Sequence, residues 1–201
     1  MIKRNLLVMG LAVLLSACGF QLRGTGTTEL TIKELDLSAR NAYGETVTQL
    51  RQVLEASGVK VVSGAPYKLY LSDEQESQRI LSYAGAGRTG EYQVNTVLSY
   101  DIRGDKNLLL KSDKLEVQKV FIHDGNNLVG SDQEANDARN ETRRELVQRM
   151  MLRLQQLTPA QLDALQQTAN ARAKAEADAL EAAQKAEAET PRQSPLELPQ
   201  Q

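Results

Sequence analysis

The chain has 201 residues with one cysteine and no tryptophan, and 24 basic side chains nearly balance 26 acidic ones, for a formal charge of −2 at pH 7. This balance gives no support to nucleic-acid binding, which usually requires a strongly basic domain. The length allows one domain of ordinary size plus a tail, and a single cysteine excludes a disulfide within the chain.

The first residues predict export. Lys3 and Arg4 precede an apolar stretch from Leu6 to Leu15, and the small residues Ser16 and Ala17 follow. A positive start, an apolar middle and small residues at the cut are typical of a secretory signal peptide. The apolar stretch is shorter than the roughly 20 residues that span a membrane. We therefore predict that residues 1–17 are a signal peptide.

The only cysteine follows this signal directly, in the sequence Leu15-Ser16-Ala17-Cys18. Bacterial lipoprotein processing recognises this pattern and attaches diacylglycerol to the thiol, and further acylation, for example with palmitate, makes the anchoring stable. The alternative is an ordinary signal peptide that happens to end near a cysteine. Gly19 takes the place of the aspartate that usually retains lipoproteins in the inner membrane. We predict lipidation at Cys18 and an outer-membrane protein that faces the periplasm.

The N-terminal half of the mature chain predicts a strand over residues 29–37 and a turn over residues 38–44. A helix is expected from Glu45 to Ser57, because its apolar residues recur at helical spacing. Gly58 is expected at the C-cap of this helix, and a short extended segment begins after it.

Three longer strands follow. Apolar residues alternate from Tyr67, and this strand is expected to continue to Tyr83 with a bulge or bend in its polar middle. A glycine-rich hairpin loop follows at 84–90. The clearest strand runs from Tyr92 to Ile102, because every second residue from Tyr92 onward is apolar, aromatic or threonine. The last strand covers residues 108–122, and a bulge near Lys119 would reconcile its two apolar registers.

A long helix is expected from about Gln133 to Leu157, with Pro159 ending it. The order of elements predicts an α+β two-layer sandwich, in which two helices cover one face of a four-stranded, mostly antiparallel or mixed sheet. We assign this domain to residues 18–157. Residues 158–201 form an Ala/Glu/Gln-rich tail, helical to disordered, with too few large apolar residues to dock firmly.

No pattern predicts catalysis, a metal site or a cofactor. His123 is the only histidine, and we interpret it as a loop-edge residue without a special role. Three tyrosines on neighbouring strands (Tyr83, Tyr92 and Tyr100) indicate core packing, or else a sugar-binding face. Basic residues gather on the three long strands: Arg79, Arg88, Arg103, Lys106, Lys111, Lys114 and Lys119. They indicate either a solvated sheet edge or a patch for an anionic ligand such as a phosphorylated glycolipid.

Two short motifs resemble a known family. The stretch Cys18-Gly19-Phe20-Gln21-Leu22-Arg23 resembles the start of the mature LptE lipoproteins, and Gly90-Glu91-Tyr92-Gln93-Val94 is similar to that family's central strand entry. The expected order of elements also matches the family's sandwich. The resemblance covers roughly residues 18–157.

The resemblance implies a function. LptE proteins plug the large β-barrel LptD, support its assembly, bind lipopolysaccharide and take part in its delivery to the outer leaflet. Basic residues near the hairpin and in the loop after the last strand are implicated in ligand binding, but residues 123–133 here contain no lysine or arginine. We therefore assign the ligand contact to Arg88, with Arg79 and Lys119 as helpers.

A different class of function stays open: a structural or accessory envelope lipoprotein, pilotin-like or linked to the cell wall, without a glycolipid ligand. An enzyme is a third and more distant alternative.

Overall fold

A computed structural model describes residues 30–84 and 89–189. In chain order the elements are β1 (Glu34–Ala39), α2 (Glu45–Ala56), β2 (Lys60–Val61), β3 (Lys68–Ala84), β4 (Thr89–Arg103), the short 3-10 helix η1 (Asp105–Asn107), β5 (Leu109–Asp124), α3 (Leu128–Gln155) and α4 (Pro159–Glu189).

The strands form one mixed sheet in the order β2-β1-β3-β4-β5. β1 runs parallel to both β2 and β3, whereas β3, β4 and β5 form an antiparallel meander. The α+β class is confirmed. The sheet has five strands rather than the four expected, because the short extended segment after Gly58 pairs with β1 as β2.

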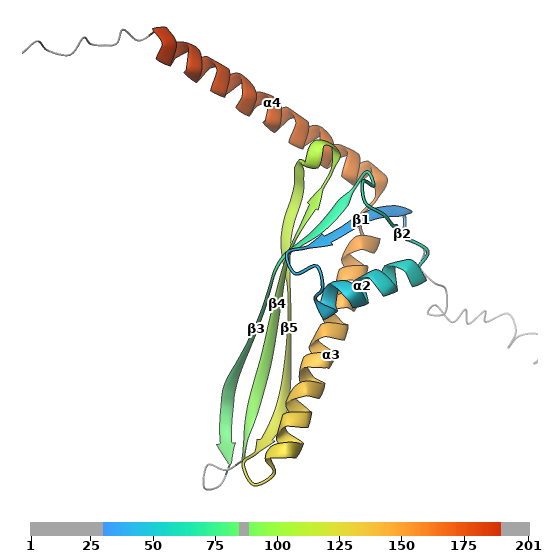
Figure 1. The fold of residues 1–201 in the computed structure, drawn as a ribbon, viewed down its shortest axis with the longest axis vertical. Coiled ribbons are helices and arrows are strands. Elements are labelled where there is room, and N and C mark those ends of the chain that lie inside the picture. The colour runs from blue at the N-terminus through green and yellow to red at the C-terminus, as the bar shows by residue number, and fades with distance from the viewer. Residues whose placement is uncertain (1–29, 85–88, 190–201) are drawn as a thin grey trace, which may run out of the picture.

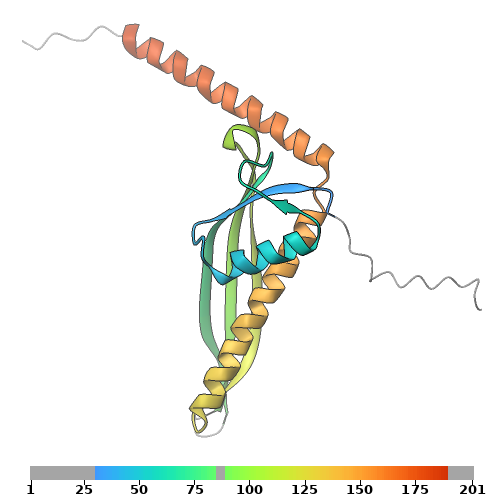
Figure 2. The same ribbon diagram turned by 45° about the vertical axis from the view of Figure 1, so that its right-hand side comes forward.

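Both α2 and α3 lie on the same side of the sheet, and α3 runs lengthwise along it (Figures 1 and 2). No element within the described ranges covers the other side of the long meander, which we call the outer face. We call the end where β3 connects to β4 and β5 connects to α3 the distal end (residues 78–84, 89–95 and 118–131). α4 starts at the opposite end of the sheet (Figure 1).

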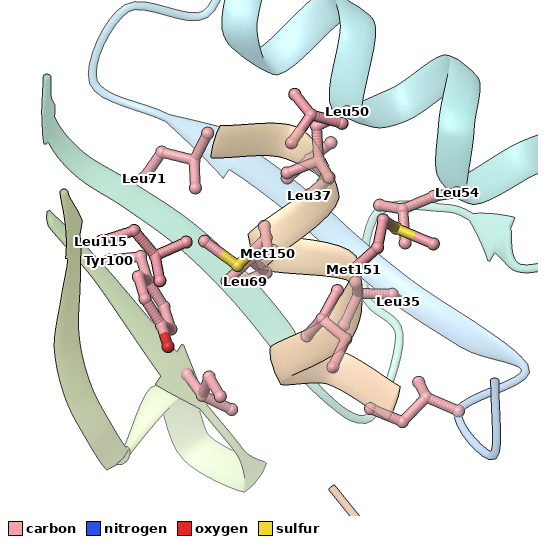
Figure 3. Close-up of a cluster of buried hydrophobic side chains, with 14 of the residues drawn as sticks. Leu35, Leu37, Leu50, Leu54, Leu69, Leu71, Tyr100, Leu115, Met150 and Met151 are labelled. Atoms are coloured by element: carbon pink, nitrogen blue, oxygen red, sulfur yellow. The ribbon is translucent and has the colours of Figure 1, made fainter. Parts of the chain in front are cut away.

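The main core lies between this sheet and the two helices. Figure 3 shows leucines from α2, β1 and β3 around Met150 and Met151 of α3, with Tyr100 and Leu115 at one side. A smaller cluster lies near the distal end and joins Val94 and Phe121 to two alanines of α3, Ala135 and Ala138. Alanine at these positions lets the helix approach the sheet closely, so α3 covers the meander far beyond the main core.

Two expectations about the N-terminal half and β3 are confirmed. α2 covers Glu45–Ala56, and Gly58 follows it with a φ of 80°, in the left-handed region that glycine adopts without strain. β3 is one long strand whose register with β4 shifts between Leu71 and Asp73 and again between Ile80 and Ser82. These irregularities flank the polar middle of the strand, where a bulge or bend was expected.

The expected bulge near Lys119 is wrong. β5 pairs with β4 without interruption from Lys111 to Asp124, and its only shift lies opposite the step from Ile102 to Arg103. Val120 and Ile122 therefore point to the outer face, while Phe121 continues the inward parity of the strand. Their apolar character reflects an exposed surface rather than a change of register.

The start expected for the second long helix is also wrong. α3 begins at Leu128, because the side chain of Asn127 accepts a hydrogen bond from the Gly130 N–H at 3.1 Å. The hydroxyl of Ser131 accepts the Asp124 N–H at 2.7 Å and ties the turn to the end of β5. The polar residues that resemble a loop in the sequence are the first turn of the helix.

The segment after Leu157 is a helix, and its first turns pack on the core. Leu162 is 1 % exposed and belongs to the main core together with Ala169. The Tyr67 hydroxyl donates to Asp163 at 3.3 Å, and the Asp105 N–H donates to Gln166 at 2.8 Å. The expectation that this segment lacks the apolar residues needed to dock is wrong for its first turns, whereas the domain boundary near 158 stays a prediction.

None of the helices in the described ranges has an apolar stretch long enough to cross a membrane.

Candidate functional site

The structure separates the two predicted ligand contacts that it describes. Arg79 pairs with Gln93 of β4, whereas Lys119 pairs with the next residue, Val94. Successive residues of a strand point to opposite faces, so Arg79 lies on the outer face and Lys119 on the face that α3 covers. The structure therefore does not bring them together. The other two predicted site residues, Cys18 and Arg88, lie outside the described residues.

Arg79 begins a chain of side-chain hydrogen bonds across the outer face. Its Nε donates to Oε1 of Gln93 at 2.5 Å, and the Gln93 amide donates to Gln118 at 2.6 Å. Gln118 in turn donates to Glu116 at 2.9 Å. Gln93 is only 7 % exposed although no element described here covers it, because its neighbours on β3 and β5 enclose it. The outer face is thus an ordered polar surface that spans three strands.

Lys119 already has an anionic partner. Its Nζ lies 2.6 Å from Oε1 of Glu141 on α3, and both side chains are about half exposed. The hydrogen bond from Lys119 lowers the pKa of Glu141, because it stabilises the ionised carboxylate. Lys119 can contact an anionic ligand only by sharing or leaving Glu141.

Other basic residues of the meander also lie close to acidic groups. Arg103 contacts Asp101 at 2.9 Å, and Lys111 lies 3.5 Å from Asp113. Lys111, Lys114 and Lys119 all belong to β5, which is an edge strand of the sheet. Their position favours the interpretation that charges on this strand discourage edge-to-edge pairing.

Two arginines of α3 connect the helix to the sheet, a feature that was not predicted from the sequence. Arg139 donates to Glu76 at 2.7 Å and to Gln78 at 3.2 Å, both on β3. Arg149 donates to the backbone carbonyl of Glu116 on the edge strand at 2.6 Å. The polar, partly acidic middle of β3 and the arginines of α3 are the sequence features that could have indicated these contacts.

A second surface went unnoticed in the sequence: large exposed apolar side chains gather at the distal end. Val120 and Ile122 are 48 % and 57 % exposed. The complete set, which we call the distal apolar surface, is Ile80, Leu81, Tyr83, Val120, Ile122, Leu128 and Val129. Apolar surface concentrated in one region of a protein marks a contact with a partner or a lipid.

The aromatic residues have separate roles. Tyr100 is buried in the main core, and Tyr92 stacks between Phe121 and His123, with ring centroids 5.8 Å and 4.9 Å away. Core packing is therefore confirmed for these two tyrosines, while Tyr83 is exposed at the distal end. His123 lies at the end of β5 and contacts a ring. Within the described residues, no group of three or more His, Cys, Asp or Glu side chains could hold a metal ion.

A mixed sheet covered on one side by helices is the fold of solved bacterial lipoproteins. The crystal structure of rare lipoprotein B from Shewanella oneidensis superposes with a TM-score of 0.55 at 20 % identity, over 60 % of this chain and 92 % of that one. The solution structure of lipoprotein B from Nitrosomonas europaea gives 0.56 at 20 % identity, over 69 % and 89 %. At this identity the likeness concerns the fold alone.

The family model LptE, described as lipopolysaccharide-assembly, matches residues 32–154. The chain therefore belongs to the LptE family, and the resemblance seen in the sequence is confirmed. Membership in a family of assembly lipoproteins also agrees with the prediction that the chain is not an enzyme.

Two relatives are both named LPS-assembly lipoprotein LptE. The protein of Pectobacterium atrosepticum is 29 % identical over 157 residues, which are 74 % of this chain and 83 % of that protein. The protein of Yersinia enterocolitica serotype O:8 is 36 % identical over 94 residues, which are 44 % of this chain and 45 % of that protein.

Proposed function

We propose that this chain is an outer-membrane lipoprotein, anchored through acylated Cys18 on the periplasmic side, that plugs the LptD β-barrel and helps it assemble. In the same role it takes part in lipopolysaccharide binding and in delivery to the outer leaflet. The observation that carries the proposal is the family match, which covers residues 32–154 and thus nearly the whole sandwich.

The outer face supports a position inside a barrel. The interior of a large membrane barrel is polar and wet, unlike its lipid-facing outside. A sheet face built from Arg79, Gln93 and Gln118, which bond to one another, suits such an interior. The same face would be unfavourable against lipid, because amide groups lose their hydrogen bonds with water there.

The distal apolar surface supports a contact at the far end of the molecule. Exposed side chains such as Ile122 and Val129 are unfavourable in water and gain from burial against a partner or an acyl chain. The end of β5 and the start of α3, which carry them, lie at the opposite end of the molecule from α4 (Figure 1). An elongated plug would carry this surface deep into a barrel while its other end stays on the periplasmic side.

We propose that Arg88 makes the main contact with the phosphates of lipopolysaccharide, helped by Arg79 and Lys119. Arginine suits phosphate because its planar guanidinium presents a fork of donors. Arg79 is exposed near the distal end of β3, which supports its part in the contact. Lys119 contributes to a lesser degree, because it lies on the face opposite to Arg79 and Glu141 already engages its charge.

The partner is tested by purifying the native lipidated protein from outer membranes in mild detergent and identifying what accompanies it by mass spectrometry. A near-stoichiometric β-barrel of LptD size is expected. Recovery of the protein alone, or with secretion or cell-wall components, would reject the plug role and favour the accessory lipoprotein.

The orientation is tested by photo-crosslinking from single positions in cells. A crosslinking residue in place of Gln75 or Ser77 sits on the outer face and is expected to capture the barrel. The same residue at Ala177, on the exposed part of α4, serves as a control of equal chemistry. Barrel adducts from Ala177 but none from the two outer-face positions would contradict the proposed arrangement.

The ligand contact is tested with Arg88→Glu, which is expected to weaken lipopolysaccharide binding in low salt. Arg172→Glu on the exposed surface of α4 makes the same charge change elsewhere and should bind like the wild type. An Arg88→Glu protein with wild-type affinity would remove Arg88 from the site. That outcome would leave the plug role standing, because the barrel is recovered in a separate measurement.

A further inference from the structure

A cavity of about 620 Å³ lies where α3 ends, α4 begins and both meet the inner face of β4 and β5. Its apolar walls come from Ile102 on β4, from Leu154 and Leu157 at the end of α3, and from Leu165 on α4. This volume falls in the range of protein sites for small ligands. The cavity is remote from the distal end, where Arg79 and Lys119 lie.

The cavity carries an excess of positive charge. Lys111 and Arg153 both line it, and Lys111 is balanced by Asp113 at 3.5 Å. The backbone N–H of Lys114 lowers the pKa of Asp113, so this carboxylate is ionised at neutral pH. Within the described residues Arg153 forms no ion pair of 4.0 Å or less, but its charge also lowers the pKa of Asp113. Two cations thus share one carboxylate, which leaves an excess of one positive charge beside an apolar space.

One wall of the cavity comes from the first turns of α4. Gln161, Ala164 and Leu165 supply that wall, and all three lie beyond Leu154, where the family match ends. Leu162, on the same helix, is buried in the core and holds the wall in place. The cavity therefore forms where α4 docks against the sandwich, whose β4, β5 and α3 supply the other walls.

We propose that this cavity binds a single alkyl chain with a negatively charged head group, the chain lying against Ile102, Leu157 and Leu165 and the head group at Arg153. An apolar space whose two cations share a single carboxylate complements a molecule with an apolar tail and one anionic end. A charge-assisted hydrogen bond from a guanidinium to a carboxylate or phosphate is stronger than a neutral one. The inference goes beyond the proposed function and does not depend on it.

Binding is measured by calorimetry on the mature chain from residue 18 with Cys18→Ser, which has no acyl anchor and needs no detergent. Dodecanoate represents a free fatty acid and lysophosphatidylglycerol represents a membrane lipid, each kept below its micelle concentration. One molecule per chain is expected to bind for at least one of them, and the arm that binds identifies the source. Dodecyl maltoside and dodecyltrimethylammonium have the same tail without the anionic head, and they should bind at least tenfold more weakly.

Two pairs of variants separate the head from the tail. Arg153→Gln is expected to weaken binding about tenfold, whereas Arg144→Gln, also an exposed arginine of α3, should leave it unchanged. Ala164→Phe fills the cavity and is expected to abolish binding, whereas Ala177→Phe on the same helix should not. All four variants change exposed positions and should fold normally. A melting curve like that of the wild type confirms this for each variant.

Three results would overturn the proposal. They are binding of neither anionic probe, equal affinity for the uncharged probe, and binding that persists in Ala164→Phe. A cavity that instead receives an apolar side chain from a protein partner would give the first of these results.

Discussion

The Nζ of Lys119 on β5 lies 2.6 Å from Oε1 of Glu141 on α3, so a cation expected to meet an anionic ligand is matched by a carboxylate of its own chain. The pair joins the edge strand of the sheet to the helix that covers it. Any ligand at Lys119 therefore competes with a contact that also positions α3.

We expect Glu141→Gln to strengthen lipopolysaccharide binding in low salt, because it releases the charge of Lys119. The free energy of unfolding should change little, since solvent-exposed ion pairs contribute little to stability. Glu145→Gln is the matched control, because it releases Arg149 on the same helix instead. If the two variants bind the ligand alike, Lys119 does not belong to the site. Binding by calorimetry and unfolding in urea provide both readouts.

Leu162→Ala is expected to lower the free energy of unfolding by about 2–5 kcal/mol, the usual cost of removing a fully buried leucine side chain. Leu180→Ala changes the same residue type on the same helix, where the side chain is 61 % exposed, and should cost less than about 0.5 kcal/mol. Urea denaturation measures both. Similar small losses would show that the first turns of α4 do not pack on the core in solution.

Truncation of α4 should act in two steps. A chain that ends after Asn170 keeps Leu162 and Ala169, and is expected to retain wild-type stability and barrel assembly. A chain that ends after Leu157 loses both and exposes apolar core surface, so its melting temperature should fall by several degrees. Whether the shorter chain still supports the barrel is read from the amount of mature LptD. Loss of LptD on truncation after Asn170 would assign a direct role to the exposed part of the helix.

The stability of the domain should decline at alkaline pH because of Tyr100. Burial raises the pKa of its hydroxyl above the ordinary value, and the nearby charge of Asp113 raises it further. A raised pKa in the folded state means that the unfolded chain releases the proton first. The stability that the protonated Tyr100 hydroxyl contributes is thus complete below about pH 10, the pKa of tyrosine in the unfolded chain. It is lost as the pH rises through the higher pKa of the folded state.

Tyr100→Phe is therefore expected to flatten the decline in the free energy of unfolding above about pH 10. Tyr43→Phe removes a hydroxyl from an almost fully exposed ring and should follow the wild-type curve. The free energy of unfolding is measured for the wild type and both variants by urea denaturation between pH 8 and pH 11. An equally steep decline in Tyr100→Phe would mean that other groups govern it.

Periodicity in the sequence predicted elements well where one face of a strand or helix is apolar. α2, β3 and β4 follow this rule, and each was expected close to its observed position. The rule failed on β5, because Val120 and Ile122 are apolar yet exposed. A pattern of apolar residues cannot distinguish a side chain that is buried in the core from one that is exposed on the surface.

The candidate site was harder to predict, because it depends on which face each side chain occupies. The sequence grouped Arg79 with Lys119 by charge and by strand, but their pairing with adjacent residues of β4 puts them on opposite faces. The docking of α4 was missed for a related reason. Two residues, Leu162 and Ala169, make its buried contacts, and so sparse a stripe does not stand out in an alanine-rich helix.

The parallel pairing of β1 with β3 has a consequence for the order of folding. Each strand of the meander meets its partner soon after it in the chain, whereas Asp36 of β1 pairs with Lys68 only after α2 and β2 have been passed. Pairings distant in sequence form late, because a longer loop must close first. We therefore expect β1, although it comes first in the domain, to be among the last elements to be buried. Until β3 is in place, the apolar side chains of β1, Leu35 and Leu37, stay exposed to water.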